Sequence, residues 1–318
     1  MAESSLVLSP DSSFYRLAES TRIRDLIDRF IRFVDVSPVS AKTYGKGVAS
    51  FFGYLSEIGE TAPSRDTVIQ YRDSLIANGL KPTTVQTYLC AVRLFFRFLA
   101  QEGLGVDIAQ HVKSPKLSRG HKKDYLTPNQ VRDVLQSCDR STEEGRRDFA
   151  LLLLMTVCGL RTIEVVRANV EDLRTVGTQS VLYLQGKGKT EKLDLVRLPP
   201  EVESAIRATF ADRKVDRTSP LFVSLSDRNK GGRMTTRSIS RIAKEAFRGV
   251  GLDSSRITAH SLRHTAVTLA LMGGVDLAEV QQFARHANIA TTQIYAHNLD
   301  RMKNHSESAI FNALSLQG

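Results

Sequence analysis

The chain has few cysteines, and the three it carries follow no pattern that cysteine chemistry uses. Cys90, Cys138 and Cys158 lie in apolar contexts, with neither CxxC spacing nor the spacing of metal ligands. Secreted disulfide-stapled domains and structural zinc sites need such patterns, so this absence argues against both classes. We expect three reduced core residues in a cytoplasmic protein.

Long apolar runs are also missing. No stretch of about 18 consecutive apolar residues exists, and a membrane-spanning helix needs roughly that length. The N-terminus, MAESSLVLSPDSSF, has no basic start followed by a long apolar core, so it does not read as a secretory signal. Internal repeats and low-complexity tracts are absent as well. We therefore expect no membrane span and no export.

Positive charge is what the chain has in excess. Its 318 residues include 44 Lys or Arg against 34 Asp or Glu, which gives a net charge of +10 and a pI near 9.6. Such an excess predicts a polyanionic partner, either nucleic acid or an anionic membrane face. The length suggests about two domains on a prior of roughly 150 residues each. Hydrophobic residues make up 42%, enough for real cores.

Residues 21–104 have the periodicity of packed helices. Apolar residues recur three and four positions apart, and Ser40 is the expected cap of the second helix. The expected helices cover about 21–34, 40–55, 64–78 and 84–101. Their aromatic side chains are expected to form a plain core. Residues 1–20 are Ser-rich and are expected to be flexible.

A basic linker is predicted over residues 105–124, GVDIAQHVKSPKLSRGHKKD. It has little periodicity and five Lys or Arg between positions 113 and 123 with no acid among them. It is either a solvated connector or a strap along a phosphate backbone. The candidates for contact with DNA phosphates, from the helical module and this linker, are Lys42, Lys46, Lys81, Thr83, Arg93, Lys113, Lys116, Lys122 and Lys123.

A second domain is predicted over residues 125–318. It opens on Thr127, Pro128 and Gln130, which suit the cap, first and third positions of a helix. A helix at 146–158 is apolar nearly all round and should be buried. Two strands, 180–185 and 191–198, are expected to form a hairpin, and 221–224 is expected to extend the small sheet. The remaining expected helices lie at about 200–213, 236–248, 260–272, 276–285 and 302–315.

The stretch Ala259–Tyr295 gathers chemically active residues between two apolar helical runs. His260 and Arg263 are three positions apart, so they share one face of a helix. An Arg beside a His suits an anion, because the guanidinium offers a planar fork of donors. Tyr295, expected after a Thr-rich turn at 290–292, can present its hydroxyl to that anion.

Two further motifs lie upstream. GLRTIE at 159–164 places Arg161 just past a buried helix, where Glu164 can orient it or simply pair with it. GKGKTEK at 186–192 places Lys187 between two glycines at the tip of the hairpin, where backbone can approach a ligand closely. Each motif alone is weak evidence of function, and the functional prediction depends on the order of all the motifs along the chain.

In that order the motifs resemble the tyrosine recombinase (phage integrase) family, and within it the short, Xer-like members. The resemblance implies a mainly α fold with a small antiparallel sheet, arranged as a C-shaped clamp of a helical SAM-like core-binding domain and a catalytic domain. It implies no cofactor and no metal. The catalytic set that it implies is Arg161, Lys187, His260, Arg263, His286 and Tyr295.

One residue departs from the family pattern. The family usually has Gly directly before the last His, whereas this chain has Arg285 before His286. With only about 20 residues ahead of the helical module, we also expect no additional arm-binding domain.

The resemblance implies a mechanism and partners. Tyr295 would attack a phosphodiester and form a 3′-phosphotyrosine, with His260 as base, His286 as donor to the phosphate and Lys187 as acid to the leaving oxygen. Strand exchange would pass through a Holliday junction held by a homotetramer, linked by the C-terminal helix at 302–315 and aided, in some systems, by an accessory directionality or cell-division protein. We expect double-stranded DNA with a specific core site as substrate, at the nucleoid.

Three rival functions stay open at this point. A non-catalytic DNA-binding regulator explains the charge but gives no reason for Tyr295 or Lys187. A zinc hydrolase would use His260, His264 and His286, although a Ser stands where a zincin has its catalytic Glu. A topoisomerase-like enzyme would share the chemistry but only nick and reseal DNA.

Overall fold

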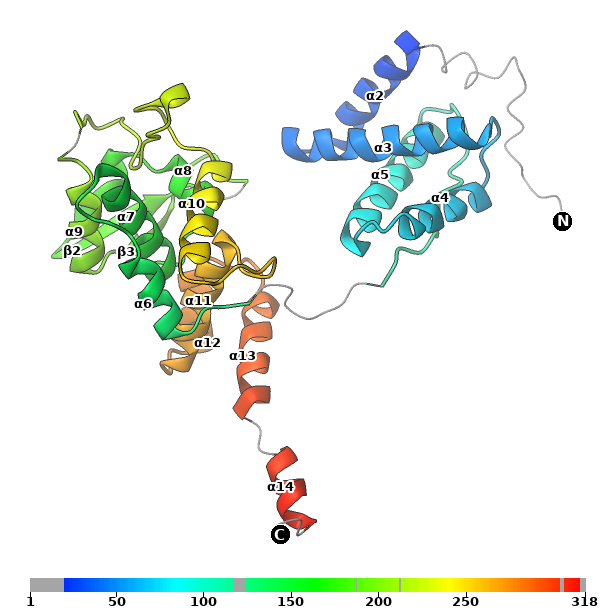
Figure 1. Ribbon diagram of the computed structural model, residues 1–318. Coiled ribbons are helices and arrows are strands. Elements are labelled where there is room, and N and C mark those ends of the chain that lie inside the picture. Colours follow the sequence, from blue (N-terminus) through cyan, green and yellow to red (C-terminus); the bar gives the residue numbers. More distant parts are fainter. Residues whose placement is uncertain (1–19, 117–123, 187, 212, 304–305, 315–318) are drawn as a thin grey trace. The chain divides into compact units, whose positions relative to one another are not determined.

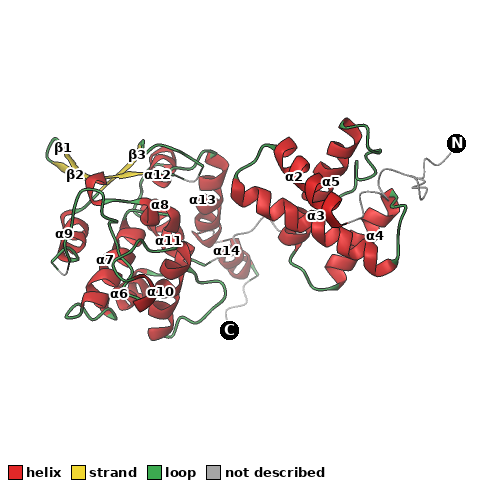
Figure 2. Cartoon of the chain, turned by 90° about the horizontal axis from the view of Figure 1, so that it is seen from above, coloured by secondary structure: helices red, strands yellow, loops and turns green. Residues whose placement is uncertain are grey.

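The protein divides into two compact units, Met1–Arg119 and Gly120–Gly318. A computed structural model describes residues 20–116, 124–186, 188–211, 213–303 and 306–314 (Figure 1). The described residues are mainly helical, with one small antiparallel sheet (Figure 2). This confirms the fold class that the sequence predicts.

The described residues of the first unit form four helices. Helix α4 (Arg65–Ala77) matches the span predicted at 64–78, whereas α3 (Pro38–Ile58) begins earlier than predicted. Its cap is Ser37 rather than Ser40, because Pro38 occupies the first helical position and the Ser40 N–H donates to the Ser37 hydroxyl. The helices are α2 (Ser20–Val34), α3 (Pro38–Ile58), α4 (Arg65–Ala77) and α5 (Pro82–Gln101).

Aromatic rings make the core of this unit. Phe95 on α5 meets Phe30 and Phe52 edge-on, with ring centroids 5.4 and 5.6 Å apart. Phe51 packs in the same way on Tyr71 and on another α5 ring. Edge-to-face pairs of this kind contribute about 0.5–1.5 kcal/mol each beyond the area they bury. Most of the predicted aromatic positions are therefore core residues, but Phe33 is 37% exposed.

The first part of the expected linker packs against the helical unit. Ile108, Ala109 and Val112 are buried in its core. The Arg93 guanidinium donates to the Val112 carbonyl and, at 2.7 Å, to the Ser114 hydroxyl. Arg93, predicted as a contact to DNA phosphates, thus holds the chain that follows α5.

The second unit surrounds the buried helix α7. Thr127 and Gln130 form the predicted capping box at the start of α6. The α-helices described in this unit as far as residue 284 are α6 (Pro128–Gln136), α7 (Glu143–Val157), α8 (Thr162–Arg167), α9 (Pro200–Ala208), α10 (Thr236–Gly249), α11 (Ala259–Met272) and α12 (Leu277–Ala284).

The sheet has three antiparallel strands in the order β1 (Leu173–Val176), β2 (Gln179–Leu184) and β3 (Asp194–Arg197). β2 and β3 correspond to the predicted hairpin. The prediction that 221–224 extends the sheet is wrong, because β1 takes that place and Val223 pairs with Arg233 only through an isolated bridge. A two-residue turn containing Gly177 joins β1 to β2, so a turn signal was present in the sequence.

Two helices end the chain where the sequence predicts one. α13 (Ile289–Lys303) includes the Thr-rich segment 290–292, so the predicted turn there is instead the first turn of a helix. α14 (Ser306–Ala313) follows, within the range predicted for the C-terminal helix. In the part of the chain that the structure describes, every helix is too short or too polar to cross a bilayer.

Candidate active site

Helix α11 brings the sequence HSLRH into the interior of the second unit. Thr258 and Ser261 cap its first turn, so the helix starts one residue before His260. Arg263 is 2% exposed and His264 7%, while His260 is exposed. A buried guanidinium is costly unless it is hydrogen-bonded, so its partners define the site.

Arg263 is held by the ends of two other helices. Its guanidinium donates to the carbonyls of Gly159, just past α7, and Ala284, the last residue of α12. Carbonyls at helix C-termini lack partners within the helix and carry the negative end of the helix dipole. Burial, followed by the charges of Arg161 and Arg285, lowers the pKa of Arg263 to about 9, so it remains a cation at neutral pH.

Arg161 stands at the start of α8 and pairs with a fully buried carboxylate. Its Nη1 lies 2.7 Å from Oε1 of Glu164, and its backbone N–H donates to Oε2. Burial raises the pKa of Glu164, but Arg285 and Arg161 together outweigh burial and hold that pKa below its usual value. Nη2 of Arg161 donates to the Arg285 carbonyl, 3.2 Å away. Glu164 therefore orients Arg161 through a direct ion pair.

Arg285 adds a third guanidinium to this site. The residue caps α12 in the left-handed conformation, with φ of 52°. Its side chain turns inward, 2.9 Å from Oε2 of Glu164 and 3.0 Å from the Gly159 carbonyl. The sequence comparison with the family pattern marked this position as unusual but did not predict that its side chain enters the site.

His286 follows at once and is kept neutral. Its Nδ1 is hydrogen-bonded to the hydroxyl of Thr292, which is fully buried on α13, at 2.9 Å. Burial lowers the pKa of His286 to about 4, with the charges of Arg263 and Arg161 adding to the effect. The tautomer in which Thr292 donates to Nδ1 leaves Nε2–H as a donor.

Tyr295 lies two turns into α13 with its hydroxyl buried. The hydroxyl is hydrogen-bonded to Nδ1 of His264, and the Tyr295 ring stacks near His286 with centroids 6.3 Å apart. Burial raises the pKa of Tyr295 to about 12, although Arg263 and Arg161 act in the opposite direction. His264 thus contacts the phenol, although the sequence analysis considered this residue only as a zinc ligand.

His260 packs against His264, the residue that contacts the phenol. Its ring meets the His264 ring edge-on, with centroids 4.6 Å apart. The spacing of four along α11 puts both rings on one face, which is the sequence signal that could have identified His264.

The structure brings together four residues of the predicted catalytic set. Arg161, Arg263, His286 and Tyr295 come from four separate segments and meet at the ends of α7 and α12. Lys187 lies outside the described residues, as do Lys122 and Lys123. Among the remaining candidates for DNA contact, the exposed ones are Lys42, Lys46, Lys81, Thr83, Lys113 and Lys116.

The arrangement of the histidines does not match the zinc alternative. His264 is bonded to Tyr295 and His286 to Thr292 through their Nδ1 atoms. Among the described residues, no three His, Cys, Asp or Glu side chains gather in a way that suits a metal ion. The site is instead a cationic one built around a phenol.

Comparison with known proteins places this site in a family. Residues 124–302 match the sequence profile described as the phage integrase family, and residues 27–103 match that of the phage integrase N-terminal SAM-like domain. Because the first match covers more than half of the chain, the chain belongs to the phage integrase family. It is a tyrosine recombinase, a class of enzyme that exchanges DNA strands.

Its relatives are Xer recombinases. The chain is 32% identical to the tyrosine recombinase XerD of Caulobacter vibrioides over 284 residues, which are 85% of this chain and 90% of that protein. It is 31% identical to the tyrosine recombinase XerC of Thermodesulfovibrio yellowstonii over 231 residues, 70% of this chain and 73% of the other.

Solved structures share the fold. The XerH site-specific recombinase bound to a palindromic difH substrate, in a post-cleavage complex, is similar with a TM-score of 0.73 and 20% identity over 94% of this chain and 86% of the other. A lambda integrase tetramer bound to a Holliday junction gives a TM-score of 0.63 at 14% identity, over 86% of this chain and 76% of the other.

Proposed function

We propose that this recombinase cleaves and rejoins DNA at a specific core site through a covalent bond between Tyr295 and a 3′-phosphate. The observation that carries the proposal is the meeting of two guanidiniums, Arg161 and Arg263, with a neutral His286 beside one buried phenol. A phosphodiester is the anion that such a set would bind, because arginine forks match phosphate oxygens.

The proposed cleavage is a phosphoryl transfer. The Tyr295 oxygen forms a bond to phosphorus while the bond from phosphorus to the 5′ oxygen breaks. Arg161 and Arg263 would stabilise the charge that grows on the non-bridging oxygens, and Nε2–H of His286 would donate to one of them. By resemblance to the family, Lys187 supplies the proton to the leaving 5′ oxygen. Rejoining reverses these transfers, so the bond energy is kept.

The phenol must lose a proton in this step. With its pKa raised to about 12, Tyr295 is a poor nucleophile until a base accepts that proton. His264 contacts the hydroxyl and His260 packs on His264. We assign the base to His260, as the family resemblance implies, and to His264 the task of holding the phenol in place.

The DNA complex would be a clamp of the two units round the duplex. Exposed Lys42, Lys46, Lys81 and Thr83 of the helical unit would meet phosphates. A homotetramer would hold two duplexes and pass through a Holliday junction. Its link would be α14 with the residue that follows it, because Ile310 and Phe311 on the helix and Leu314 just after it are 60%, 48% and 61% exposed. Against this link stands the alternative that α14 folds back on its own unit.

The biological role would be either integration and excision of a mobile element or resolution of chromosome dimers at the nucleoid. An accessory directionality or cell-division protein would then set the outcome. The DNA that flanks the gene is the place to search for the core site, and sequencing it comes first.

A suicide-substrate assay tests the chemistry. Wild type and Tyr295→Phe are incubated with core-site DNA nicked next to the cleavage position, and products are separated on a denaturing gel. We expect a covalent protein–DNA band with wild type and none with the variant. Covalent attachment by Tyr295→Phe, or binding of site DNA by wild type without any attachment, would reject the proposed nucleophile and favour a DNA-binding regulator.

A second assay separates recombination from nicking and resealing. Supercoiled plasmids carrying two core sites are incubated with wild type, and both topology and recombinant products are scored. Recombinant circles support strand exchange. Relaxation without recombinants, at every protein concentration, would assign a topoisomerase-like activity to the same site.

A further inference from the structure

Arg285 occupies a position at which its backbone conformation favours glycine. The N–H groups of Arg285 and His286 return to the carbonyls of Gln282 and Gln281, which closes α12 in the usual C-terminal manner. With φ of 52°, a side chain there costs roughly 1 kcal/mol that glycine would not. The chain nevertheless places its longest cationic side chain at this residue.

That side chain is an integral part of the interior. It is 7% exposed, and its Nη1 donates to the Phe283 carbonyl at 2.8 Å. Its Nη2 reaches both the Gly159 carbonyl and Oε2 of Glu164. The buried Nε–H has no hydrogen-bond partner within the described residues. A strained backbone and an unpaired donor are unfavourable, so stability alone is a poor reason for an arginine here.

The contacts of Arg285 tie together the segments that carry the other cations. Its side chain joins Gly159, a carbonyl that also holds Arg263. It binds Oε2 of Glu164, while the Arg161 guanidinium binds Oε1. Its own carbonyl accepts from Nη2 of Arg161. His286 is the next residue, so its direction depends on the same turn.

We propose that Arg285 is a positioning residue of the cleavage site: it locks the ends of α7 and α12 to Glu164 and thereby fixes how Arg161 and His286 face the reacting phosphate. This inference rests on the proposed function above. It assigns Arg285 no contact with the phosphate, since its Nη atoms are already engaged by two carbonyls and a carboxylate.

The test compares Arg285→Gly with Arg285→Lys in single-turnover cleavage of the suicide substrate. Glycine keeps the turn and removes the side chain, whereas lysine keeps the charge without the two-point fork. We expect Arg285→Gly to cleave about 10- to 100-fold more slowly with unchanged DNA affinity, because misplaced groups lose rate at this scale. Arg285→Lys should recover part of the rate.

A double-mutant cycle with Glu164→Gln measures the coupling between Arg285 and Glu164 and gives a second test if one variant folds poorly. If Arg285 acts by holding Glu164, removing its side chain from the Glu164→Gln protein costs little further rate. Fully additive losses would overturn the proposal.

The titration of His286, followed by NMR in the DNA-free protein, gives a readout that a mere helix cap does not move. The charged and titratable groups that face it are Arg161, Arg263, Arg285, His260 and Tyr295, and each of the arginines lowers its pKa. Arg285→Gly should raise the pKa of His286 above about 4, and Arg285→Lys should raise it less.

Two failures can be told apart. If wild type never attaches to DNA, the proposed function itself is wrong. If wild type attaches through Tyr295 and Arg285→Gly cleaves within about twofold of it, a difference of under 0.5 kcal/mol in barrier, only the role of Arg285 is rejected.

Discussion

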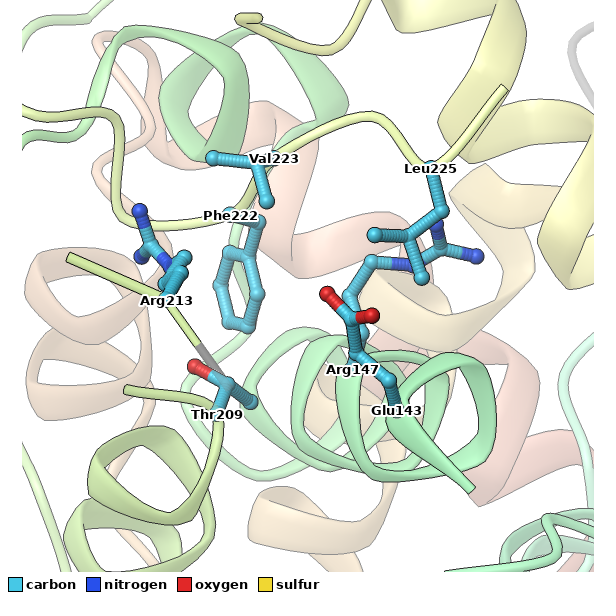
Figure 3. Close-up of a pocket in the computed structure, with 7 residues that line it drawn as sticks. All are labelled: Glu143, Arg147, Thr209, Arg213, Phe222, Val223 and Leu225. Atoms are coloured by element: carbon cyan, nitrogen blue, oxygen red, sulfur yellow. The ribbon is translucent and has the colours of Figure 1, made fainter. Parts of the chain in front are cut away.

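Among its described residues, the second unit holds two groups of buried or half-buried arginines, and the groups differ in what they are paired with. In the active-site cluster, Arg161, Arg263 and Arg285 share one carboxylate, Glu164, so the four side chains carry a net charge of +2. In the pocket cluster of Figure 3, Arg147 and Arg213 lie on either side of Phe222, with acidic Glu143 on the lining.

The pocket cluster is satisfied by its own surroundings. Arg147 is 2.6 Å from Asp148 and 3.3 Å from Glu144. Arg213 donates to the carbonyls of Pro220 and Leu221, which holds together two parts of the loop that follows α9. With Glu143 included, three carboxylates face two guanidiniums.

The partners of a buried arginine therefore help to distinguish a structural arginine from a functional one. A buried cation needs compensation, and carboxylates provide it when stability is the sole demand. The active-site cluster is compensated mostly by neutral carbonyls at helix ends, which hold the guanidiniums without cancelling their charge. That leaves a net positive charge at the site, which suits an anionic ligand.

The largest effect is expected from Arg263→Ala in the active-site cluster. Loss of one donor to a developing negative charge lowers single-turnover cleavage by about 100- to 1,000-fold. DNA affinity, measured by fluorescence anisotropy, should change little by comparison. If Arg263→Ala cleaves at the wild-type rate, the two clusters do not differ in function.

Next comes Glu164→Gln, which leaves two cations without their carboxylate. Breaking a buried ion pair in this way costs about 3–5 kcal/mol of unfolding free energy. Because the folded-state pKa of Glu164 is lowered, its contribution is present above the usual carboxyl pKa of 4.5 and is lost as pH falls through the folded-state pKa.

Urea unfolding of both proteins at several pH values checks this sign. The stability gap between wild type and Glu164→Gln should be full at pH 7 and should shrink on acidification. A gap that is independent of pH would show that charge on Glu164 is not what the variant removes.

A smaller effect, on stability alone, is expected from Arg213→Ala in the pocket cluster. The variant leaves two carbonyls without their donor and should lose about 1–3 kcal/mol of unfolding free energy. Cleavage per folded molecule should equal that of wild type, since Arg213 contacts no residue of the active-site cluster among its assigned bonds. A slower cleavage rate would show that Arg213 is not purely structural and would contradict the distinction between the two clusters.

The smallest effect extends the same rule to the helical unit. Lys46 is exposed, whereas Arg93 is held by Val112 and Ser114. Lys46→Ala should weaken DNA binding and reduce the slope of log affinity against log salt by about 1, as expected for one lost phosphate contact. Arg93→Ala should leave that slope unchanged. Salt titrations of the two variants decide between the assignments.

Local pattern explains which parts of the fold could be predicted. The start of α6 at Thr127 and the span of α4 follow from caps and helical period, which act over a few residues. The misplaced turn at 290–292 has a local cause too, because Thr favours turns by propensity while packing of α13 on α11 and α12 makes the segment helical. Strand β1 was not predicted, because its four residues are too few to show an alternation of apolar and polar side chains.

Short motifs and charge were enough to predict the family and the order of its reactive residues, since both can be recognised without knowledge of packing. The contact of His264 with Tyr295 and the inward turn of Arg285 onto Glu164 became known from the folded chain alone. Such contacts escape sequence patterns because their partners are far apart along the chain. Arg285 and Glu164 are 121 positions apart, and their meeting depends on how two helix ends pack against each other.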